Sequence, residues 1–414
     1  MKWLFVTVDF PWPLVKGYCV RIYNLSRALI ARGDRVSLLC YPGNRVQNEA
    51  YSKLGVEIIS GLKGRSRQKG KSRSFLAPFV YHDSLAKLLS ECGCEFDIIV
   101  LVNSETLQYS PEACSCGAFV LANVADDPVL EIYRRMKRLK NPIMFGRYAK
   151  FIVGHLLYER SFVRYVDLLT FVSSTDAESF SRRHREANVR FVPNGVDVEY
   201  YRRRQSVVPS FLEKFRRDSV IVFPGNMSHP PNVDAAEFIV NEIAPLVWSR
   251  SSDVCFVLAG CNPSERVKRL GGERVIVTGF VEDLRPILWN CCGVIIPMRI
   301  GTGIKNKLLE AWASESAVIA TSRACQGIPA RSGENLLIGD SADELAEQIE
   351  KLIADDVLRK RIARGGRETV EREMTWMNTI SQLYEYIPVV SDGESAGKSE
   401  ELSSVSFCCA EDCI

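Results

Sequence analysis

The segment 298–311 combines residue types and spacing that suit the binding of phosphate. Its sequence, MRIGTGIKNKLLEA, predicts the end of a strand, a turn at Gly301-Thr302-Gly303 and a helix over 304–313. Such a turn leaves backbone N–H groups and the positive end of the helix dipole facing a ligand. Glycines also let a phosphate approach the backbone closely. The segment therefore predicts an anion site at the start of a helix.

Charged side chains flank this turn. Gly303, Lys307 and Glu310 have the spacing i, i+4, i+7 and share one helical face, and Arg299 and Lys305 add positive charge beside it. The lysines suit a diphosphate, and Glu310 suits the two hydroxyls of a ribose, so together they fit a nucleotide sugar. The alternative is an exposed i, i+3 ion pair on an ordinary helix, which contributes about 0.2–0.5 kcal/mol.

Short apolar runs alternate with helical patterns along most of the chain. A first block has expected strands at 3–9, 35–41, 56–59, 97–102, 119–124, 167–172 and 189–192. A second block has them at 219–223, 254–260, 275–278, 293–298 and 317–321. Long helices are expected over 128–166 and 232–248. Repeated β-α-β units predict two α/β, Rossmann-like domains, each a doubly wound parallel sheet, facing across a cleft.

We expect the first domain to cover 1–195 and the second 196–370, with a helix near 371–389 packing back on the first domain. Residues 390–414 form a Ser- and Glu-rich stretch with a net charge of −5, against +8 for the rest of the chain. This composition predicts a disordered acidic tail. In doubly wound domains ligands bind beyond the carboxyl ends of the strands, so the ligand site is expected in the cleft.

Several motifs, none specific alone, occur together in this order. They are Pro11-x-Pro13 with Lys16-Gly17, then 193–197 (PNGVD), 225–227 (GNM), 231–235 (PNVDA), 277–281 (VTGFV), 297–313 and Trp376. This combination resembles the retaining glycosyltransferases of GT-B architecture (glycosyl transferases group 1), above all those that build bacterial exopolysaccharide and other surface glycans. The resemblance spans most of the chain outside the tail.

The resemblance implies a metal-independent enzyme that moves a sugar, with retention, from a nucleotide sugar to a glycan or lipid-linked acceptor. No cofactor is implied beyond the nucleotide-sugar donor. Carried onto this chain, the donor-binding residues are Gly17, Gly225, Asn226, His229, Gly279, Phe280, Val281, Arg299, Gly301, Thr302, Gly303, Ile304, Lys305, Lys307 and Glu310. The residues expected to act in catalysis are Asp126, Lys307 and Glu310.

Two positions depart from the pattern of the family. Thr302 stands where the first glutamate of the Glu-x7-Glu motif usually contacts the donor sugar. Asn226, Ser228 and His229 stand where an Arg/Lys pair often follows the first strand of the second domain. Arg299, Lys305 and Lys307 are candidates to supply the lost charge. The departures leave the donor sugar open and keep two alternatives, a non-catalytic nucleotide-sugar-binding paralogue and a nucleotide-sugar epimerase of the same fold.

Asp126 and Asp127 follow the expected strand 119–124 and precede Pro128. One interpretation is that they orient the acceptor hydroxyl. The other is that one of them caps the following helix, whose first position suits proline.

The sequence does not suggest metal or dinucleotide chemistry. The four histidines have no metal-ligand spacing, and the first expected strand leads into Phe10-Pro11-Trp12-Pro13 without a Gly-x-Gly-x-x-Gly turn. The pairs Cys92/Cys94 and Cys114/Cys116 would bind zinc only if their strands were neighbours; reduced core cysteines are the alternative.

With 414 residues, 46% of them apolar, no run of about 18 apolar residues and no secretory leader pattern, the sequence predicts a cytoplasmic enzyme. The stretch from Lys63 to Arg73 carries six basic residues and no acid. A second basic cluster spans 134–140. We interpret the charge as docking to an anionic membrane at the inner face, the alternative being an ordinary solvated surface. Nucleic acid is not indicated, because no recognised nucleic-acid motif accompanies the charge.

Overall fold

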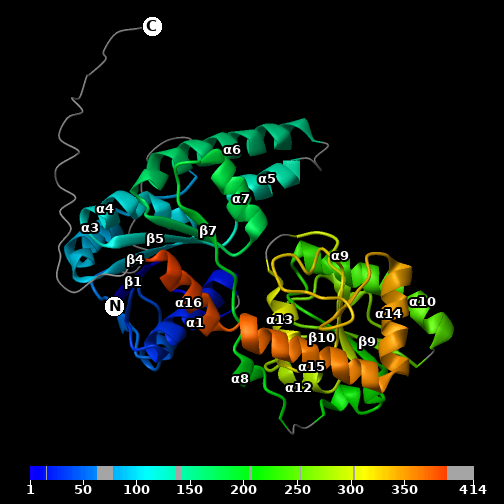
Figure 1. Cartoon of the computed structure of the whole chain (residues 1–414). Coiled ribbons are helices and arrows are strands. Elements are labelled where there is room, and N and C mark those ends of the chain that lie inside the picture. The colour runs from blue at the N-terminus through cyan, green and yellow to red at the C-terminus, as the bar shows by residue number, and fades with distance from the viewer. Residues whose placement is uncertain are drawn as a thin grey trace.

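The computed structural model describes residues 1–14, 16–62, 78–136, 141–204, 208–251, 253–301 and 304–388; of Arg135 the backbone alone is described. The basic stretch from Lys63 to Arg73, the turn residues Thr302 and Gly303 and the acidic tail 390–414 lie outside these ranges. Figure 1 shows two α/β bodies side by side, one built from the N-terminal half and the other from the C-terminal half.

The N-terminal sheet has seven parallel strands in the order β3-β2-β1-β4-β5-β6-β7. Their bounds are β1 Lys2–Val6, β2 Arg35–Leu39, β3 Glu57–Ile58, β4 Ile98–Val102, β5 Phe119–Val124, β6 Leu168–Phe171 and β7 Val189–Phe191. All five residues of β4 (IIVLV) are buried, as expected for a parallel sheet covered by helices on both faces. The strand order reverses between β1 and β4.

Seven α-helices belong to the described part of this half. They are α1 Gly17–Ala31, α2 Arg45–Ser52, α3 Asp83–Cys92, α4 Ser110–Ser115, α5 Pro128–Met136, α6 Pro142–Phe162 and α7 Ser174–Arg183. The single helix expected over 128–166 is therefore wrong, since the structure has two. Asn141 starts the second one: its side-chain oxygen accepts the N–H groups of Ile143 and Met144, and Pro142 occupies the first turn.

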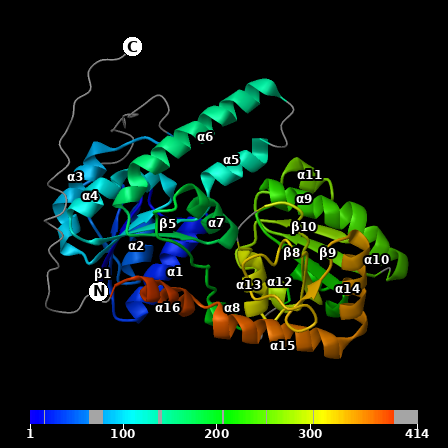
Figure 2. The same ribbon diagram turned by 45° about the horizontal axis from the view of Figure 1, so that its top comes forward.

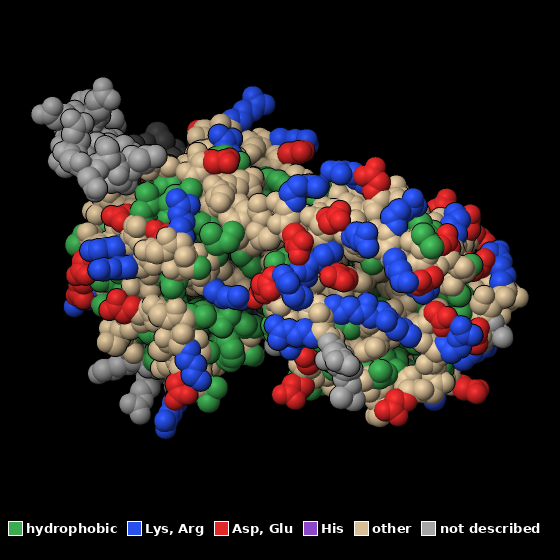
Figure 3. All heavy atoms as spheres, turned by 60° about the horizontal axis from the view of Figure 1, so that its bottom comes forward, with side chains coloured by type: hydrophobic (Ala, Val, Ile, Leu, Met, Phe, Trp, Pro, Cys, Tyr) green, Lys and Arg blue, Asp and Glu red, His purple; other side chains and the backbone are tan. Residues whose placement is uncertain are grey.

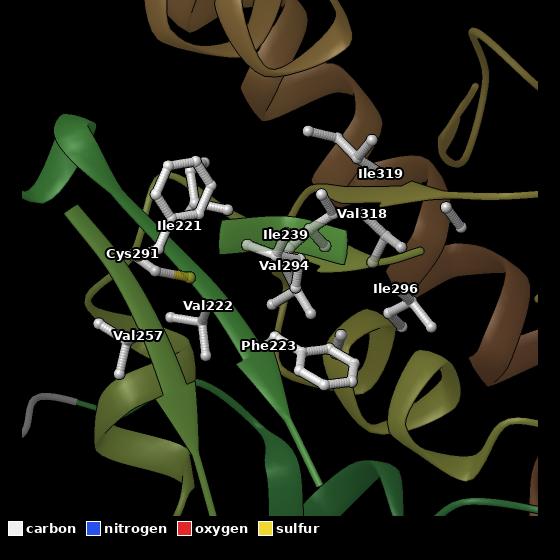
Figure 4. Packing of buried hydrophobic residues seen from close by; sticks show 14 of the residues in the cluster. Ile221, Val222, Phe223, Ile239, Val257, Cys291, Val294, Ile296, Val318 and Ile319 are labelled. Carbon is white, nitrogen blue, oxygen red and sulfur yellow. The ribbon is translucent and has the colours of Figure 1, made fainter. Parts of the chain in front are cut away.

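The C-terminal sheet has six parallel strands in the order β10-β9-β8-β11-β12-β13. Their bounds are β8 Val220–Pro224, β9 Cys255–Ala259, β10 Val275–Gly279, β11 Gly293–Ile296, β12 Val318–Ala320 and β13 Leu337–Ile338. The order reverses between β8 and β11. Ile221, Val222 and Phe223 of β8 pack with Val294 of β11 and with Ile239 in the core of this half (Figure 4).

The described α-helices that follow β7 belong to this half, except the last of them, α16. They are α8 Val198–Tyr201, α9 Pro230–Phe238, α10 Ala244–Arg250, α11 Glu265–Lys268, α12 Arg285–Trp289, α13 Asn306–Ala313, α14 Ala342–Ala354, α15 Asp356–Glu373 and α16 Trp376–Tyr386. The helix expected over 232–248 is interrupted by a π-helical turn at Ile239–Ile243. Pro245, in the first turn of α10, has no N–H to donate, which fits a wider turn at this point.

The last helix, α16, returns to the N-terminal half. Trp376, Ile380 and Leu383 belong to the same buried cluster as Trp3 of β1 and Ile22 of α1. The hydroxyl of Tyr384 donates a hydrogen bond of 2.6 Å to Asp34. Figures 1 and 2 both show α15 on the C-terminal half leading directly into α16 against α1. The chain therefore crosses between the two halves a second time.

Candidate functional site

The loops after β8 and β11 meet where the strand order of the second sheet reverses, which is the usual ligand position in such sheets. Gly225, in the first loop, has a φ of +156°, and a Cβ built on it would lie 2.8 Å from Lys307 Nζ. A Cβ built on Gly260, after β9, would lie 1.9 Å from the carbonyl oxygen of Gly225. Glycine at both positions therefore lets two loops and the Lys307 side chain come together.

Lys307, in the first turn of α13, extends back to the loop after β8. Its Nζ donates a hydrogen bond of 2.7 Å to Asn232 Oδ1 and lies 4.5 Å from the centre of the Phe223 ring. The Asn232 amide donates in turn to the carbonyl oxygen of Asn226 at 2.8 Å. Desolvation lowers the pKa of Lys307 to about 7; Glu310 opposes the shift and Lys305 adds to it. The Lys307 ammonium group therefore lies beside the segment after β8, where the family often has an Arg/Lys pair.

Lys305 precedes α13 and is 9% exposed. Burial lowers its pKa to about 8, with Arg323 acting in the same direction and Asp126 and Asp176 acting against it. Asp126 comes from the loop after β5, and Asp176 from the first turn of α7, which follows β6. The carboxyl edges of the two sheets therefore face each other here, and we call the space around Lys305 and Asp126 the interdomain site.

Glu310 lies one turn further along α13 and shares a side-chain hydrogen bond with Tyr201 of α8. Burial raises the pKa of its carboxyl group, while Lys307 and the tyrosine hydroxyl lower it. A hydrogen bond across the halves joins Asn194 to Asn306, the first residue of α13, at 3.1 Å. The helix that carries the predicted chemistry is thus held from both halves.

Arg299 is engaged elsewhere. Its guanidinium pairs with Asp234 and Glu242 at 3.0 Å each and lies 4.2 Å from the centre of the Phe238 ring. These two carboxylates neutralise Arg299 in the ligand-free protein, and its role in donor binding stays a prediction. Lys305 and Lys307 remain to supply the charge.

The other described donor candidates border the same edge. Gly301 has a φ of +101°, which favours glycine, and Ile304 is half-buried against the core of the C-terminal half. Asn226 accepts the N–H of Ser228 at 3.1 Å within the loop after β8, and His229 is the exposed residue before α9. Thr302 and Gly303 lie outside the described residues.

The remaining candidates lie at β10 and α1. Gly279 ends β10 with a φ of +70° and no atom within 4 Å of a Cβ built on it. The side chain of Phe280 is 79% exposed, and Val281 is half-buried. Gly17 begins α1, again with open space where a side chain would be. Gly17 and Gly279 therefore leave room for a ligand.

The two aspartates after β5 differ in role. Asp127 is fully buried, accepts the N–H groups of Val129 and Leu130 at the start of α5, and pairs with Arg183 at 2.8 Å. Asp127 is therefore the residue that caps the helix beginning at Pro128, as one of the two interpretations of the sequence expected. Asp126 is solvent-accessible, and desolvation by the surrounding protein, together with Glu131, raises its pKa, while Lys305 lowers it. Asp126 is thus the one that faces the C-terminal half.

Sequence reasoning missed three residues of this site: Asp176, Tyr201 and Asn232. Asp176 is 1% exposed and its Oδ2 has no hydrogen-bond partner. Burial and the nearby Asp126 raise its pKa to about 6. A signal for it existed, because it follows β6 at the same edge as Asp126. Tyr201 and Asn232 reach Glu310 and Lys307 only through tertiary packing; Asn232 belongs to the motif 231–235, but that motif did not indicate its contact with Lys307.

Metal ligation has no support among the described residues, where no group of three His, Cys, Asp or Glu is placed to hold an ion. Cys92, Cys94, Cys114 and Cys116 are free thiols. In the same part of the chain, none of the helices combines the length and apolarity needed to cross a bilayer.

Two doubly wound parallel sheets, with a glycine-bearing turn and lysines at their facing carboxyl edges, define the GT-B class of glycosyltransferase folds. Comparison with protein families agrees: residues 15–200 match "Glycosyltransferase Family 4" and residues 218–355 match "Glycosyl transferases group 1". The chain belongs to the group 1 glycosyltransferases. The predicted family and the predicted fold class are therefore confirmed.

Curated relatives match over parts of the chain. The sequence is 28% identical over 193 residues to an uncharacterized 44.6 kDa protein in the cps region of Klebsiella pneumoniae, covering 44% of this chain and 46% of that protein. It is 34% identical over 99 residues to the lipopolysaccharide core biosynthesis glycosyltransferase LpsE of Rhizobium meliloti, covering 23% of this chain and 29% of LpsE. Each match spans less than half the length of the relative.

Solved structures match over nearly the whole fold. Anabaena HepE in complex with UDP gives a TM-score of 0.64 at 16% identity, covering 93% of this chain and 99% of HepE. Sucrose-phosphate synthase from Thermosynechococcus elongatus gives 0.63 at 16%, covering 93% and 98%. WaaG, a glycosyltransferase involved in lipopolysaccharide biosynthesis, gives 0.60 at 15%, covering 92% and 98%. At these identities the likeness shows the fold.

Proposed function

We propose that this protein transfers a sugar, with retention, from a nucleoside diphosphate sugar to a glycan or lipid-linked acceptor in the synthesis of a surface polysaccharide. The donor would bind the C-terminal half, residues 196–370. The acceptor would bind residues 1–195 together with the returning helix at 371–389. The relatives in a capsule region and in lipopolysaccharide core synthesis support this assignment.

The observation that carries the proposal is the state of the two lysines at the start of α13. Lys305 and Lys307 lie beside each other, and burial lowers their pKa values to about 8 and 7, so both lose part of their charge near neutral pH when no ligand is bound. A diphosphate at the same point would restore the protonated forms. Glu310, held by Tyr201 one turn away, is spaced to accept the hydroxyls of the attached ribose.

The same groups account for the transfer step. The bond between the anomeric carbon and the β-phosphate oxygen breaks, and the negative charge that develops on the diphosphate faces Lys305, Lys307 and the N-terminus of α13. Asp126, across the interdomain site, would orient the acceptor hydroxyl toward the anomeric carbon. Anabaena HepE forms complexes with UDP and with UDP-glucose, which makes a uridine nucleotide the first candidate for the donor.

The acceptor side of the proposal includes an anionic membrane surface. We infer this membrane contact from the six basic residues between Lys63 and Arg73, which lie outside the described residues. Neutralising the basic residues of that stretch should weaken binding to anionic vesicles; unchanged binding would remove this stretch from the proposal.

The test is a thermal-shift series with UDP, GDP, ADP and CDP, with and without EDTA, on the wild-type chain and on Glu310→Ala. Glu385→Ala, an exposed glutamate on α16, is the matched control. Stabilisation by one nucleotide that survives EDTA, persists in the control and disappears in Glu310→Ala supports the donor site. No shift with any nucleotide would overturn it.

Measuring turnover distinguishes a glycosyltransferase from a non-catalytic paralogue and from an epimerase. Release of the nucleoside diphosphate from a nucleotide sugar, dependent on an added acceptor and lost in a Lys307→Ala/Glu310→Ala variant, indicates a transferase. Tight nucleotide binding without release would indicate a non-catalytic paralogue, and interconversion of two nucleotide sugars would indicate an epimerase.

A further inference from the structure

A cavity of about 520 Å³ lies at the edge of the C-terminal sheet opposite the donor candidates. Its walls include residues shortly before three strands: Asp218 before β8, Cys291 and Cys292 before β11, and Ala317 before β12. The donor candidates of this half instead follow β8, β10 and β11, at the carboxyl ends of the strands. The cavity is therefore separate from the interdomain site, and its volume lies in the range of about 300–1,000 Å³ that holds small molecules.

The walls of this cavity, which we call the basic cavity, carry more positive than negative charge. Five basic and three acidic residues line it: Arg203, Arg216, Arg217, Arg359 and Lys360, with Asp218, Glu315 and Asp356. Ion pairs neutralise part of this charge, since Asp218 pairs with Arg216, and Asp356 pairs with both basic residues of α15. Figure 3 shows Lys and Arg side chains over the part of the C-terminal half that α15 crosses, with Asp and Glu side chains among them.

Two arginines of the basic cavity have no carboxylate partner. Neither Arg203 nor Arg217 forms an ion pair with any residue that the structure describes. Arg203 is half-buried, and its guanidinium donates a hydrogen bond of 2.6 Å to the carbonyl oxygen of Trp289. Burial lowers the pKa of Arg203, and the neighbouring charge of Arg217 lowers it further. The two guanidinium groups therefore repel each other, and an anion bound between them would remove this repulsion.

Glu315 stands on the wall of the basic cavity in a backbone conformation that favours glycine. Its φ is +54°, and its N–H donates to the carbonyl oxygen of Trp312 at the end of α13. Glycine is the usual residue at such a helix end, and a strained conformation elsewhere than at glycine often accompanies a function of the side chain. The Glu315 side chain is exposed and has no ion pair within the described ranges. Its carboxylate is therefore available to accept hydrogen bonds from a ligand.

We propose that the basic cavity binds a small phosphomonoester that also carries hydroxyl groups. A phosphomonoester has a charge of about −1.5 to −2 at pH 7, which matches two unpaired arginines better than a single carboxylate does. The guanidinium group also presents parallel N–H donors that fit two oxygens of a phosphate. Glu315 would accept the hydroxyl hydrogens, and the apolar residues Leu288, Ala317 and Ala363 would contact the carbon skeleton.

The basic cavity lies against two elements that also support the donor site. Glu315 lies just beyond the end of α13, and Arg203 follows Tyr201 of α8 by two residues. A ligand in the cavity would thus contact the support of the donor site without contacting Lys307 or Glu310, which do not line the cavity. The inference therefore goes beyond the proposed function and does not depend on it.

The test titrates the full chain with inorganic phosphate and with glycerol 3-phosphate, at constant ionic strength, and follows the thermal shift. Both probes should stabilise the wild type, and glycerol 3-phosphate should bind more tightly, because it adds hydroxyl groups to the phosphate. Arg217→Ala should weaken the binding of both probes about tenfold, because one charge-assisted contact is lost. Arg217→Glu should abolish it. Arg217 is exposed, so neither change removes a part of the core.

Glu315→Gly tests the hydroxyl part of the proposal. It removes the carboxylate and places glycine where the backbone favours it, so Tm without ligand should rise. The variant should bind glycerol 3-phosphate about fivefold more weakly and inorganic phosphate at least as tightly as the wild type. Equal weakening of both probes would show that Glu315 does not recognise hydroxyl groups.

Two controls separate the basic cavity from other anion sites. Lys307→Met removes the charge of the donor site, and Arg269→Ala removes an exposed arginine of the same half that does not line the cavity. Both should keep the thermal shift with the two probes, and Arg217→Ala should weaken it in the Lys307→Met chain as it does in the wild type.

Three results would overturn the proposal. The first is a wild type that neither probe stabilises, and the second is an Arg217→Glu variant that binds like the wild type. The third is a shift that disappears in Lys307→Met, because the phosphate would then belong to the donor site. UDP takes no part in these titrations, so they succeed or fail independently of the proposed function.

Discussion

Lys307 and Lys305 carry a pH dependence that belongs to these two residues. Their pKa values of about 7 and 8 mean that both lose charge between neutral and mildly alkaline pH in the ligand-free protein. A diphosphate favours their protonated forms, so binding should take up protons in this range. We expect the affinity for UDP to fall as the pH rises through 7 and 8. Calorimetric titration in buffers of different ionisation enthalpy measures the uptake.

Lys307→Met provides the matching stability prediction. In the folded protein the pKa of Lys307 lies below its usual value of 10.5, so between pH 7 and 10.5 the unfolded chain binds more protons. The lysine therefore destabilises the fold fully below pH 7, and the penalty is relieved as the pH rises. Without nucleotide, Lys307→Met should raise Tm at pH 6 by about 2–4 °C, with a smaller gain above pH 9. A lower Tm at pH 6 would contradict this.

Asp126 and Asp127 are neighbours with opposite expected phenotypes. Asp127→Asn weakens the cap of α5 and removes one of the two buried carboxylates that pair with Arg183, which should cost about 1–3 kcal/mol in the free energy of unfolding. Asp126→Asn should leave stability within about 0.5 kcal/mol and lower kcat instead. Chemical denaturation and initial rates measure the two effects. Equal losses of stability would remove the functional assignment of Asp126.

At the scale of elements, α8 is a short helix whose task is to hold Tyr201 against α13. Asp197 caps it by accepting the N–H of Tyr200 at 3.0 Å. Arg285 donates to the carbonyl oxygen of Tyr200 at 2.9 Å, and the indole N–H of Trp289 donates to that of Tyr201 at 3.1 Å. These bonds fix α8 on α12, so the Tyr201 hydroxyl is positioned before any ligand arrives.

Tyr201→Phe should therefore act on the ribose and not on the phosphates. Losing one hydrogen bond to the Glu310 carboxylate should weaken UDP binding about five- to tenfold. Binding of inorganic pyrophosphate, which has no ribose, should not change. Tyr200→Phe, which alters the exposed neighbour, is the control. Equal weakening of UDP and pyrophosphate would show a general disturbance of α13 instead.

The sequence predicted the positions of strands and turns well, but it did not predict which side chains pair between elements. Apolar runs such as 98–102 predicted the strands, and the glycines near 301 predicted the turn before α13, because both are local signals. The split of α5 from α6 was missed although Asn141-Pro142 is a local start signal. The ion pairs of Arg299 with Asp234 and Glu242 were not predicted, because these partners lie about 60 positions earlier in the chain. Side-chain pairing across elements is what the sequence pattern cannot supply.

At the scale of the whole molecule, the two halves are joined by more than one chain crossing. The two crossing segments, near residues 195 and 375, lie side by side. The N–H of Val196 in the first donates to the carbonyl oxygen of Met374 in the second at 2.8 Å. A Cβ built on Gly195 would lie 2.4 Å from the backbone nitrogen of Trp376, so the two strands of chain touch there. The Thr379 hydroxyl donates to the carbonyl oxygen of Pro193 at 3.2 Å. This double crossing is the natural position for any movement between the halves.

The same arrangement makes α16 part of the N-terminal body, although it is the last described helix. Ile380 is fully buried in the cluster that includes Trp3 and Ile22, whereas Ile349 of α14 is fully buried in the core of the C-terminal half. Each Ile→Ala change should lower the free energy of unfolding by about 2–5 kcal/mol. Ile380→Ala should destabilise the N-terminal body and Ile349→Ala the C-terminal body. In scanning calorimetry with UDP, the transition that UDP raises reports the C-terminal body. Ile349→Ala should lower that transition and Ile380→Ala the other. If Ile380→Ala lowers the UDP-sensitive transition alone, α16 belongs energetically to the donor half, and the double crossing is a hinge for α15 and α16 together.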